Sequence, residues 1–424
     1  MSSPLIKRRP RIFSGIYRPD AKVARFLNVI ALSGVAYGLY RGIQDNYLAE
    51  IMHITPFERG IVEFFRETPG LLVVFILSLM YKFSDSRIFK IGTALMAGGM
   101  VGLLLTSTGP FFMTKFFVVL FMVTYSAGEH IIMPVKSTIS MDLARREKAG
   151  ASLGITSSIT QFGQIAGFVI VTVLFFILAR AGFGRTDIFG FRIVFGLSVA
   201  LMTASVLTVL ALSETKLKSQ RRRFYFSRKF SKYYMLEVFY GARKQIFLTF
   251  APYVLILHYG ADPSIMSLLY AVCAGFGIVF SPVIGRIIDR LGYKVVMVAD
   301  TLILVVVCLL YGFSHRLFPK DIAFMVVCAN FVLDSIISIA SMAANVYVQR
   351  IASNQEEITA TLSTGISVNH IVSILIALAG GWIWKVTGIE VLFALSAILG
   401  IINSLYAATI KKSEENIARG ETSV

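Results

Sequence analysis

Charged residues are scarce in this chain. Asp, Glu, Lys and Arg make up 15% of its 424 residues, against roughly 25% in soluble globular domains. Hydrophobic residues make up 56%, and apolar runs of about 20 residues, each long enough to cross a bilayer core, recur along the whole length. Transmembrane barrel strands alternate every second residue and do not give such runs. The composition therefore excludes an ordinary soluble domain and predicts an all-α, polytopic membrane protein.

The residues that carry most enzyme chemistry are also rare or scattered. The three cysteines, Cys273, Cys308 and Cys328, all fall in apolar stretches, and no Cys or His pair has metal-ligand spacing. A phosphate-binding loop of the form G-x-x-x-x-G-K-[ST] is absent, as is a nucleophile motif. The sequence therefore predicts no cofactor, no metal and no enzymatic activity.

Acidic residues are outnumbered, with 24 Asp and Glu against 41 Lys and Arg, for a net charge of +17. The excess positive charge gathers in the N-terminal tail, in the central connection with its run Arg221–Arg223, and in loops expected on the same side of a membrane. This asymmetry is typical of loops on the cytoplasmic side. It predicts contact with anionic lipid rather than with nucleic acid, and it places both termini in the cytoplasm.

Hydropathy divides the chain into twelve predicted spans. We expect a basic tail at 1–25, a six-helix bundle at 26–213, a basic linker at 214–232, a second six-helix bundle at 233–410 and a tail at 411–424. No short apolar segment with a cleavage site follows the basic start, so the N-terminus is expected to be retained. The spans are 27–50, 57–81, 88–107, 112–135, 149–179, 192–213, 233–258, 263–285, 294–313, 321–345, 357–383 and 388–409.

The two predicted bundles repeat one another. Tyr37-Gly38 aligns with Tyr240-Gly241, and three ionisable positions follow at offsets of 203 to 205 residues. A nearly constant offset is what two parallel halves, related by an axis along the membrane normal, would produce. The aligned ionisable pairs are Arg41 with Lys244, Asp85 with Asp289, and Glu129 with Asp334.

One loop motif identifies a family. The run from Gly285 to Lys294 reads G-x-x-x-D-R-x-G-x-K, with Asp289, Arg290 and Gly292 at the other fixed positions. It resembles the signature that joins the second and third helices of each half in the major facilitator superfamily. Gly285 would allow two helices to approach closely, and Gly292 would permit a sharp bend. The first-half copy keeps Asp85 and Arg87 but lacks both glycines.

The resemblance implies a secondary active transporter that works by alternating access. In the family, the motif acid caps a helix of the opposite half when the cytoplasmic gate is shut, so Asp289 is expected to dock near Gly150–Ser152. The family also implies a central cavity lined by spans 1, 4, 7 and 10. Span 5 carries Gly154, Gly163 and Gly167, like the start of an antiporter glycine motif; close helix packing is the favoured interpretation.

Ionisable residues within spans are costly, so we expect them to face a cavity or to pair. Arg41 and Asp45 lie one helical turn apart, which fits mutual pairing as well as substrate contact. A carboxyl group in such a cavity can bind a proton on one side and release it on the other; Na⁺ binding with Asn46 or Asn330 is the alternative. The predicted substrate-binding residues are Arg41, Arg243, Lys244 and Asn330, and the predicted coupling residues are Asp45, Glu129, His130 and Asp334.

Three functional hypotheses follow. The first is proton-coupled transport of a small organic anion by a monomer in a bacterial inner membrane, with Lys244 as the main positive group. The second is proton-driven efflux of amphipathic or lipid-like compounds through a cavity lined by some of the 34 Phe and 17 Tyr. The third is a sensor that signals through the 214–232 connection.

Overall fold

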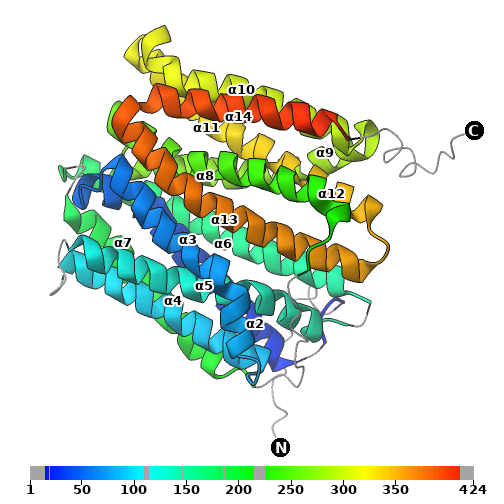
Figure 1. The fold of residues 1–424 in the computed structure, drawn as a ribbon. Coiled ribbons are helices and arrows are strands. Elements are labelled where there is room, and N and C mark those ends of the chain that lie inside the picture. The colour runs from blue at the N-terminus through cyan, green and yellow to red at the C-terminus, as the bar shows by residue number, and fades with distance from the viewer. Residues whose placement is uncertain are drawn as a thin grey trace, which may run out of the picture.

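The computed structural model describes residues 15–18, 20–108, 114–145, 147–184, 187–213 and 225–410, and long helices dominate it (Figure 1). The basic run at 221–223 and the tail from 411 lie outside the described residues. The first half contains α2 (Ala21–Asn46) with a π-helical turn (Tyr47–Ile51), α3 (Pro56–Leu79), α4 (Asp85–Thr108), α5 (Lys115–Leu143), α6 (Ala149–Arg180) and α7 (Ile188–Leu210).

The second half begins with a 3₁₀ turn at Arg228–Phe230, and its first helix starts at Ser231, inside the stretch predicted as linker. The predicted span at 321–345 is divided by a second 3₁₀ turn, Ile339–Ser341. The helices are α8 (Ser231–Tyr259), α9 (Pro263–Leu291), α10 (Tyr293–Leu317), α11 (Lys320–Ser338), α12 (Met342–Ile351), α13 (Gln355–Thr387) and α14 (Ile389–Ala408).

Local sequence signals set several helix starts. Thr55 and Glu58 form a capping box at the start of α3, and Asp262 accepts from the Ile265 N–H at 2.9 Å to cap α9. These side chains satisfy backbone N–H groups that have no partner within the helix. Asn354 caps α13 in the same way, with the Glu357 N–H at 2.8 Å from its Oδ1.

Ten helical segments in the described part of the chain are long and apolar enough to cross a membrane. The chain is therefore an integral, multi-pass membrane protein. Two other long helices, α3 and α8, correspond to predicted spans but carry several ionisable residues each. That these two also cross the bilayer, which would give twelve spans, stays a prediction.

Each half packs mainly within itself, and a few helices join the halves. In the first half α2 packs on α6 and α7, and α4 packs on α5; in the second, α8 packs on α13, and α10 packs on α14. Contact between the halves runs mainly through α3 against α13 and α6 against α9; α3, α13 and α6 lie near the centre of Figure 1. These four helices therefore form most of the contact between the halves.

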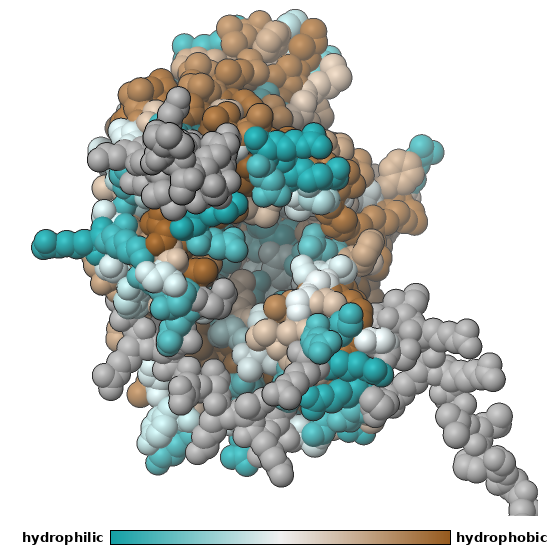
Figure 2. Space-filling model, turned by 90° about the vertical axis from the view of Figure 1, so that its right-hand side faces the viewer, coloured by the Kyte–Doolittle hydropathy of each residue, from teal (hydrophilic) through white to brown (hydrophobic). Residues whose placement is uncertain are grey.

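The ends of the described chain lie at one end of the molecule, here called the terminal end. Arg25 at the start of α2 donates to the Ala211 carbonyl after α7 at 2.7 Å, and Lys294 donates to the Ile410 carbonyl at 2.6 Å. Figure 2 looks onto this end and shows a recess between two bodies, with hydrophilic residues around and within it. The terminal end is therefore the open one in this conformation.

At the opposite end, hydrogen bonds close the molecule across the halves. The Asn46 amide donates to the Ala261 carbonyl at 2.9 Å, and the Ser267 hydroxyl donates to the Gly42 carbonyl at 2.9 Å. Ser264 donates to the Thr172 carbonyl, also at 2.9 Å. The end of α2 and the middle of α6 are thus bonded to the start of α9 and the loop before it.

The loop motif lies at the open end. Gly292 has φ +86°, as the predicted bend requires. The expected close approach at Gly285 is wrong for this conformation, because a Cβ added there would meet no atom within 4 Å. Asp289 and Arg290 are exposed, so the predicted docking of Asp289 on α6 is not made here. In the first-half copy Asp85 is buried in the first turn of α4, and Arg87 is exposed.

Glycines bring α2 and α6 into close contact. A Cβ added at Gly167 would lie 2.4 Å from the Val35 carbonyl oxygen, and one at Gly38 would lie 2.2 Å from the Gln164 carbonyl oxygen. Gly163 faces α2 at 3.0 Å, whereas Gly154 has open space. The interpretation of these span 5 glycines as packing residues is therefore confirmed for Gly163 and Gly167.

Candidate functional site

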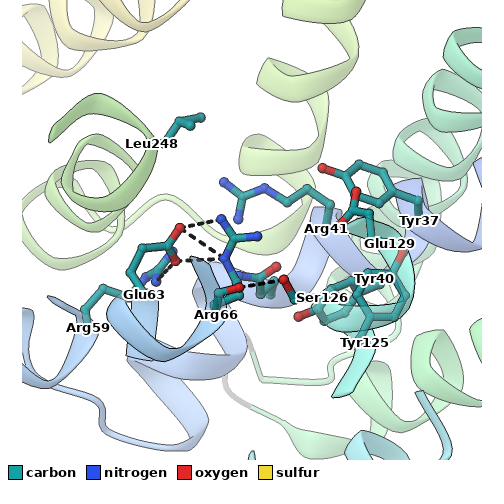
Figure 3. A pocket seen from close by; sticks show the side chains of 11 residues that line it. Tyr37, Tyr40, Arg41, Arg59, Glu63, Arg66, Tyr125, Ser126, Glu129 and Leu248 are labelled. Atoms are coloured by element: carbon teal, nitrogen blue, oxygen red, sulfur yellow. Dashed lines mark hydrogen bonds and ion pairs between the residues drawn. The ribbon is translucent and has the colours of Figure 1, made fainter. Parts of the chain in front are cut away.

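Two connected pockets lie between the halves. One, with about 500 Å³ of space free of atoms, lies among α2, α3 and α5 and touches Leu248 of α8 (Figure 3). The other, with about 760 Å³, lies mainly among α8, α9 and α11. Arg41 and Leu248 line both, so the two spaces adjoin. We call them the N-terminal pocket and the C-terminal pocket.

The pockets preserve the sequence repeat. Tyr37, Arg41 and Glu129 line the N-terminal pocket. Their aligned partners, Tyr240, Lys244 and Asp334, line the C-terminal pocket. An alignment made from spacing alone thus corresponds to equivalent positions around one central space.

The Asp45 carboxylate binds three other side chains. Its side chain is 1% exposed, and it accepts from Arg41 at 2.8 Å, from Arg59 at 3.2 Å and from the Tyr270 hydroxyl at 2.6 Å. Arg41 and Arg59 lie in the first half, whereas Tyr270 lies on α9 of the second. Since a buried carboxylate needs partners for its lone pairs, this arrangement fixes Asp45 as a bond between the halves.

The ion pairs continue along α3. Arg59 donates to Glu63 at 2.6 Å, Glu63 is held by both Nε and Nη2 of Arg66, and Arg66 also bonds Glu67. The Glu67 carboxylate then reaches Nδ1 of His370 on α13 at 3.0 Å. Figure 3 shows Glu63 and Arg66 directed toward each other beside Arg41. Glu63, Arg66 and Glu67 therefore form ion pairs with one another within this helix.

The second half has its own buried ion pairs, which share one arginine. Arg243 donates to Asp300 of α10 at 3.1 Å and to Asp334 of α11 at 3.4 Å, and only 5% of its side chain is exposed. The longer contact, to Asp334, faces the C-terminal pocket. Arg243 is therefore shared between two carboxylates, and the looser of the two bonds borders the central space.

Two pocket residues have no such partner. Lys244 lines the C-terminal pocket and Glu129 lines the N-terminal one, and neither forms an ion pair or hydrogen bond with another described residue. In Figure 3, Glu129 lies beside Tyr37, and Arg41 extends into the space toward Leu248. One cation and one carboxylate are thus available to a ligand, a proton or an ion.

Two predicted site residues are directed elsewhere. Asn330 donates to the Val326 carbonyl of its own helix at 2.8 Å and lines neither pocket. His130 bonds Ser126 and lies against His370, with ring centroids 5.3 Å apart. A role for Asn330 in substrate binding and for His130 in coupling stays a prediction.

Sequence reasoning missed three members of the site. Arg59, Asp300 and Tyr270 are not among the site residues that the sequence predicts. The cost of an ion within a predicted span is the signal that could have found Arg59 and Asp300. No spacing rule identifies Tyr270, because its partner Asp45 lies 225 residues away.

Comparison with known proteins agrees with this architecture. Residues 233–422 match the family model described as Major Facilitator Superfamily, whereas none of the curated proteins matches the sequence.

Solved structures with a similar fold include the nucleoside transporter NupG (D323A mutant), with a TM-score of 0.74 and 13% identity over 92% of this chain and 100% of that one. The D-xylose-proton symporter has a TM-score of 0.70 and 12% identity over 92% of this chain and 98% of that one. A POT family transporter in complex with 5-aminolevulinic acid has a TM-score of 0.69 and 13% identity over 92% of this chain and 96% of that one.

Proposed function

We propose that this chain, a protein of the major facilitator superfamily, is a proton-coupled secondary active transporter of a small organic anion. The observation that carries the proposal is the pair of unpartnered ionisable groups, Lys244 and Glu129, one in each of the two adjoining pockets. Fold alone does not define a substrate, so the proposal depends on these side chains.

Lys244 supplies the positive charge for the substrate. Every other basic side chain of the C-terminal pocket, Arg41 and Arg243, already has a carboxylate partner. Ser335, Ser338 and Tyr240 line the same pocket and offer hydroxyl groups for hydrogen bonding. An ammonium group among hydroxyls, partly shielded from water, suits a carboxylate or phosphate of modest size.

Glu129 and Asp334 provide the proton coupling. Glu129 has no fixed partner and faces the pocket, so it can gain or lose a proton without breaking a bond. Protonation of Asp334 would weaken its contact with Arg243 and leave that guanidinium less neutralised beside the pocket. Binding of a proton would then favour binding of an anion, as symport requires.

During alternating access, the end that is closed here would open and the end that is open here would close. The present conformation is closed by the Asp45–Tyr270, Asn46–Ala261 and Ser267–Gly42 bonds and open at the terminal end, which we place in the cytoplasm. In the converse state, Asp289 would reach the start of α6, where no side chain caps the helix. Such a contact is worth about 0.3–2 kcal/mol, enough to bias two states that differ by a few kcal/mol.

Export of amphipathic compounds is the second candidate. Phe247, Tyr270 and Phe331 form an aromatic wall in the C-terminal pocket, and such a wall accommodates apolar groups without directional bonds. In that case aromatic side chains and one acid would carry the function, and Lys244 would be dispensable.

A thermal-shift screen of detergent-purified protein separates the two. Organic anions, sugars, nucleosides, cationic drugs and lysolipids would each be tested at about pH 5.5 and about pH 7.5, since a ligand raises stability by RT ln(1 + [L]/Kd). We expect anions to raise the melting temperature of wild type and Lys244→Arg but not of Lys244→Gln. The control variant is Lys385→Gln, which changes an exposed lysine of α13. Amphipath shifts that are equal in all variants, with no response to anions, would overturn the anion proposal.

A further inference from the structure

Three side chains with metal-binding chemistry converge where the halves meet. Glu67 lies on α3, His130 on α5 and His370 on α13, and one ligand atom from each lies within 4.8 Å of the others. No spacing pattern predicts this cluster, because the residues are 63 to 303 positions apart. Within the described residues, these three side chains form the group that could hold a metal ion.

The orientation of His130 leaves one ring nitrogen available. Nδ1 lies 2.8 Å from the Ser126 carbonyl oxygen, and a carbonyl only accepts, so Nδ1 carries the hydrogen. In the neutral ring Nε2 then has a free lone pair. A histidine that donates its other N–H to a backbone carbonyl is the usual arrangement of a metal ligand.

Glu67 and His370 are aligned by their own neighbours. Arg66 binds Oε1 of Glu67, and the other oxygen, Oε2, lies 3.0 Å from Nδ1 of His370. The His370 ring stands edge-on to that of His130, with the planes at 70°. The carboxylate and both imidazoles thus face a common point rather than three separate directions.

A glycine allows the two rings to come close together. Gly70 lies one turn after Glu67 on α3, and a Cβ added to it would be 2.6 Å from Nε2 of His130 and 2.7 Å from Cε1 of His370. The absence of a side chain therefore lets both rings pack against the backbone of α3 and approach each other.

We propose that Glu67, His130 and His370 bind one divalent transition-metal ion, of the Zn²⁺ or Co²⁺ class. Two imidazoles and one carboxylate are an established ligand set for such ions, with a further position left to water. Oxygen-preferring ions such as Mg²⁺ are disfavoured by the two nitrogen ligands.

The site would also act on conformation. Glu67 and His130 belong to the first half and His370 to the second, so the bound ion ties the halves together. An ion that binds one conformation and not another shifts the population toward the first. Occupancy would therefore stabilise the present conformation and slow any motion that separates α13 from α3 and α5.

The test uses full-length protein freed of any histidine tag and stripped with a chelator. Titration with ZnCl₂ in a calorimeter and with CoCl₂ in an absorption spectrometer measures affinity and coordination. We expect one ion per chain, visible Co²⁺ bands of a four- or five-coordinate site, and no competition from excess MgCl₂. His370→Asn and Glu67→Gln should weaken binding by more than about 100-fold, since even neighbouring groups of a site change affinity 10–100-fold.

A matched control is available at the opposite end of the second half. His315 also contacts a carboxylate, Glu390, at 3.2 Å, so His315→Asn removes a histidine–carboxylate pair without touching the site. Gly70→Ala adds a methyl group and no charge; it should push the two rings away from α3 and weaken binding of the ion, even if Glu67→Gln fails to fold. Absence of stoichiometric binding by wild type, or equal loss in His315→Asn, would overturn the proposal. No transported substrate is needed, so the result is independent of the proposed transport.

Discussion

The carboxylate of Asp45 shows that a single side chain in this chain can bind several others at once. It accepts hydrogen bonds from two guanidinium groups and one phenol, all in a buried setting. Removing one member of a buried ion pair leaves the other charge uncompensated, which costs about 3–5 kcal/mol, whereas one hydrogen bond to a charged group is worth about 1.5–3 kcal/mol. These magnitudes separate the roles of Asp45 and Tyr270.

We therefore predict that Asp45→Asn lowers the free energy of unfolding by about 3–5 kcal/mol and that Tyr270→Phe lowers it by about 1.5–3 kcal/mol. Melting temperatures of the two purified variants in detergent provide the measurement. Equal losses in the two variants would mean that Arg41 and Arg59 do not depend on Asp45.

Glu129 has the opposite character, because it lines a pocket without a fixed partner. Glu129→Gln keeps the shape of the side chain but cannot exchange a proton. In proteoliposomes loaded with the anion found by thermal shift, we expect the variant to lose accumulation driven by a pH gradient and to keep exchange at equal pH. Glu58→Gln, which alters a partly exposed pair with Lys115, should keep both. Gradient-driven accumulation by Glu129→Gln would remove Glu129 from the coupling mechanism.

At the residue scale, the sequence predicted which residues belong to the site better than it predicted which residues they pair with. The cost of ions in a membrane singled out Arg41, Asp45, Glu129, Arg243 and Asp334, and all five lie in or beside the two pockets. Pairing across helices could not be derived in the same way. Asp300 binds Arg243 from α10 because of how α8 and α10 are placed in the bundle, which depends on packing rather than on spacing.

The helix pair α2 and α6 provides a test at the scale of elements. A Cβ at Gly167 would come within 2.4 Å of a backbone oxygen of α2, which cannot move aside as a side chain can. Gly167→Ala should therefore push the helices apart and cost about 1–3 kcal/mol. Gly154→Ala changes the same helix where nothing lies within 4 Å, and it should be neutral or stabilising, because alanine favours helix by about 1 kcal/mol over glycine. Thermal melting of both variants checks this, and similar melting temperatures would contradict it.

Helix positions were predictable where apolar runs are long, and less so at their interruptions. The span at 321–345 reads as one apolar run, yet a 3₁₀ turn at Ile339–Ser341 divides it into α11 and α12. No glycine or proline stands in that turn, so no breaker residue announced the division. The first span likewise ends in a π-helical turn, Tyr47–Ile51, beside the Asn46–Ala261 bond between the halves. Such departures depend on tertiary contacts.

Whole-molecule motion is testable through the closed end. A Cβ on Gly42 would lie 2.7 Å from the Ser267 hydroxyl oxygen, so Gly42→Cys with Ser267→Cys should form a disulfide in the present conformation. In a background without the three native cysteines, we expect oxidation to abolish transport and reduction to restore it. A second pair, Gly150→Cys with Asp289→Cys, should cross-link only in the converse state.

The two cross-links should exclude one another within a single molecule. Mobility shifts on gels after oxidation, together with ligand binding, provide the readout. Full transport activity in the oxidised Gly42–Ser267 pair would show that the end closed here does not open during the cycle.

The ion pairs of the first half also determine how the molecule responds to voltage. Arg41, Arg59 and Arg66 are matched by Asp45, Glu63 and Glu67, so their formal charges sum to zero and they move together as one electrically neutral body. A membrane potential of 100 mV acts on each net charge that crosses it with about 2.3 kcal/mol. The membrane potential therefore exerts little net force on this network. The electrical sensitivity of the cycle falls instead on the unpaired Lys244 and Glu129, and on Arg243 with Asp300 and Asp334, whose formal charges sum to −1.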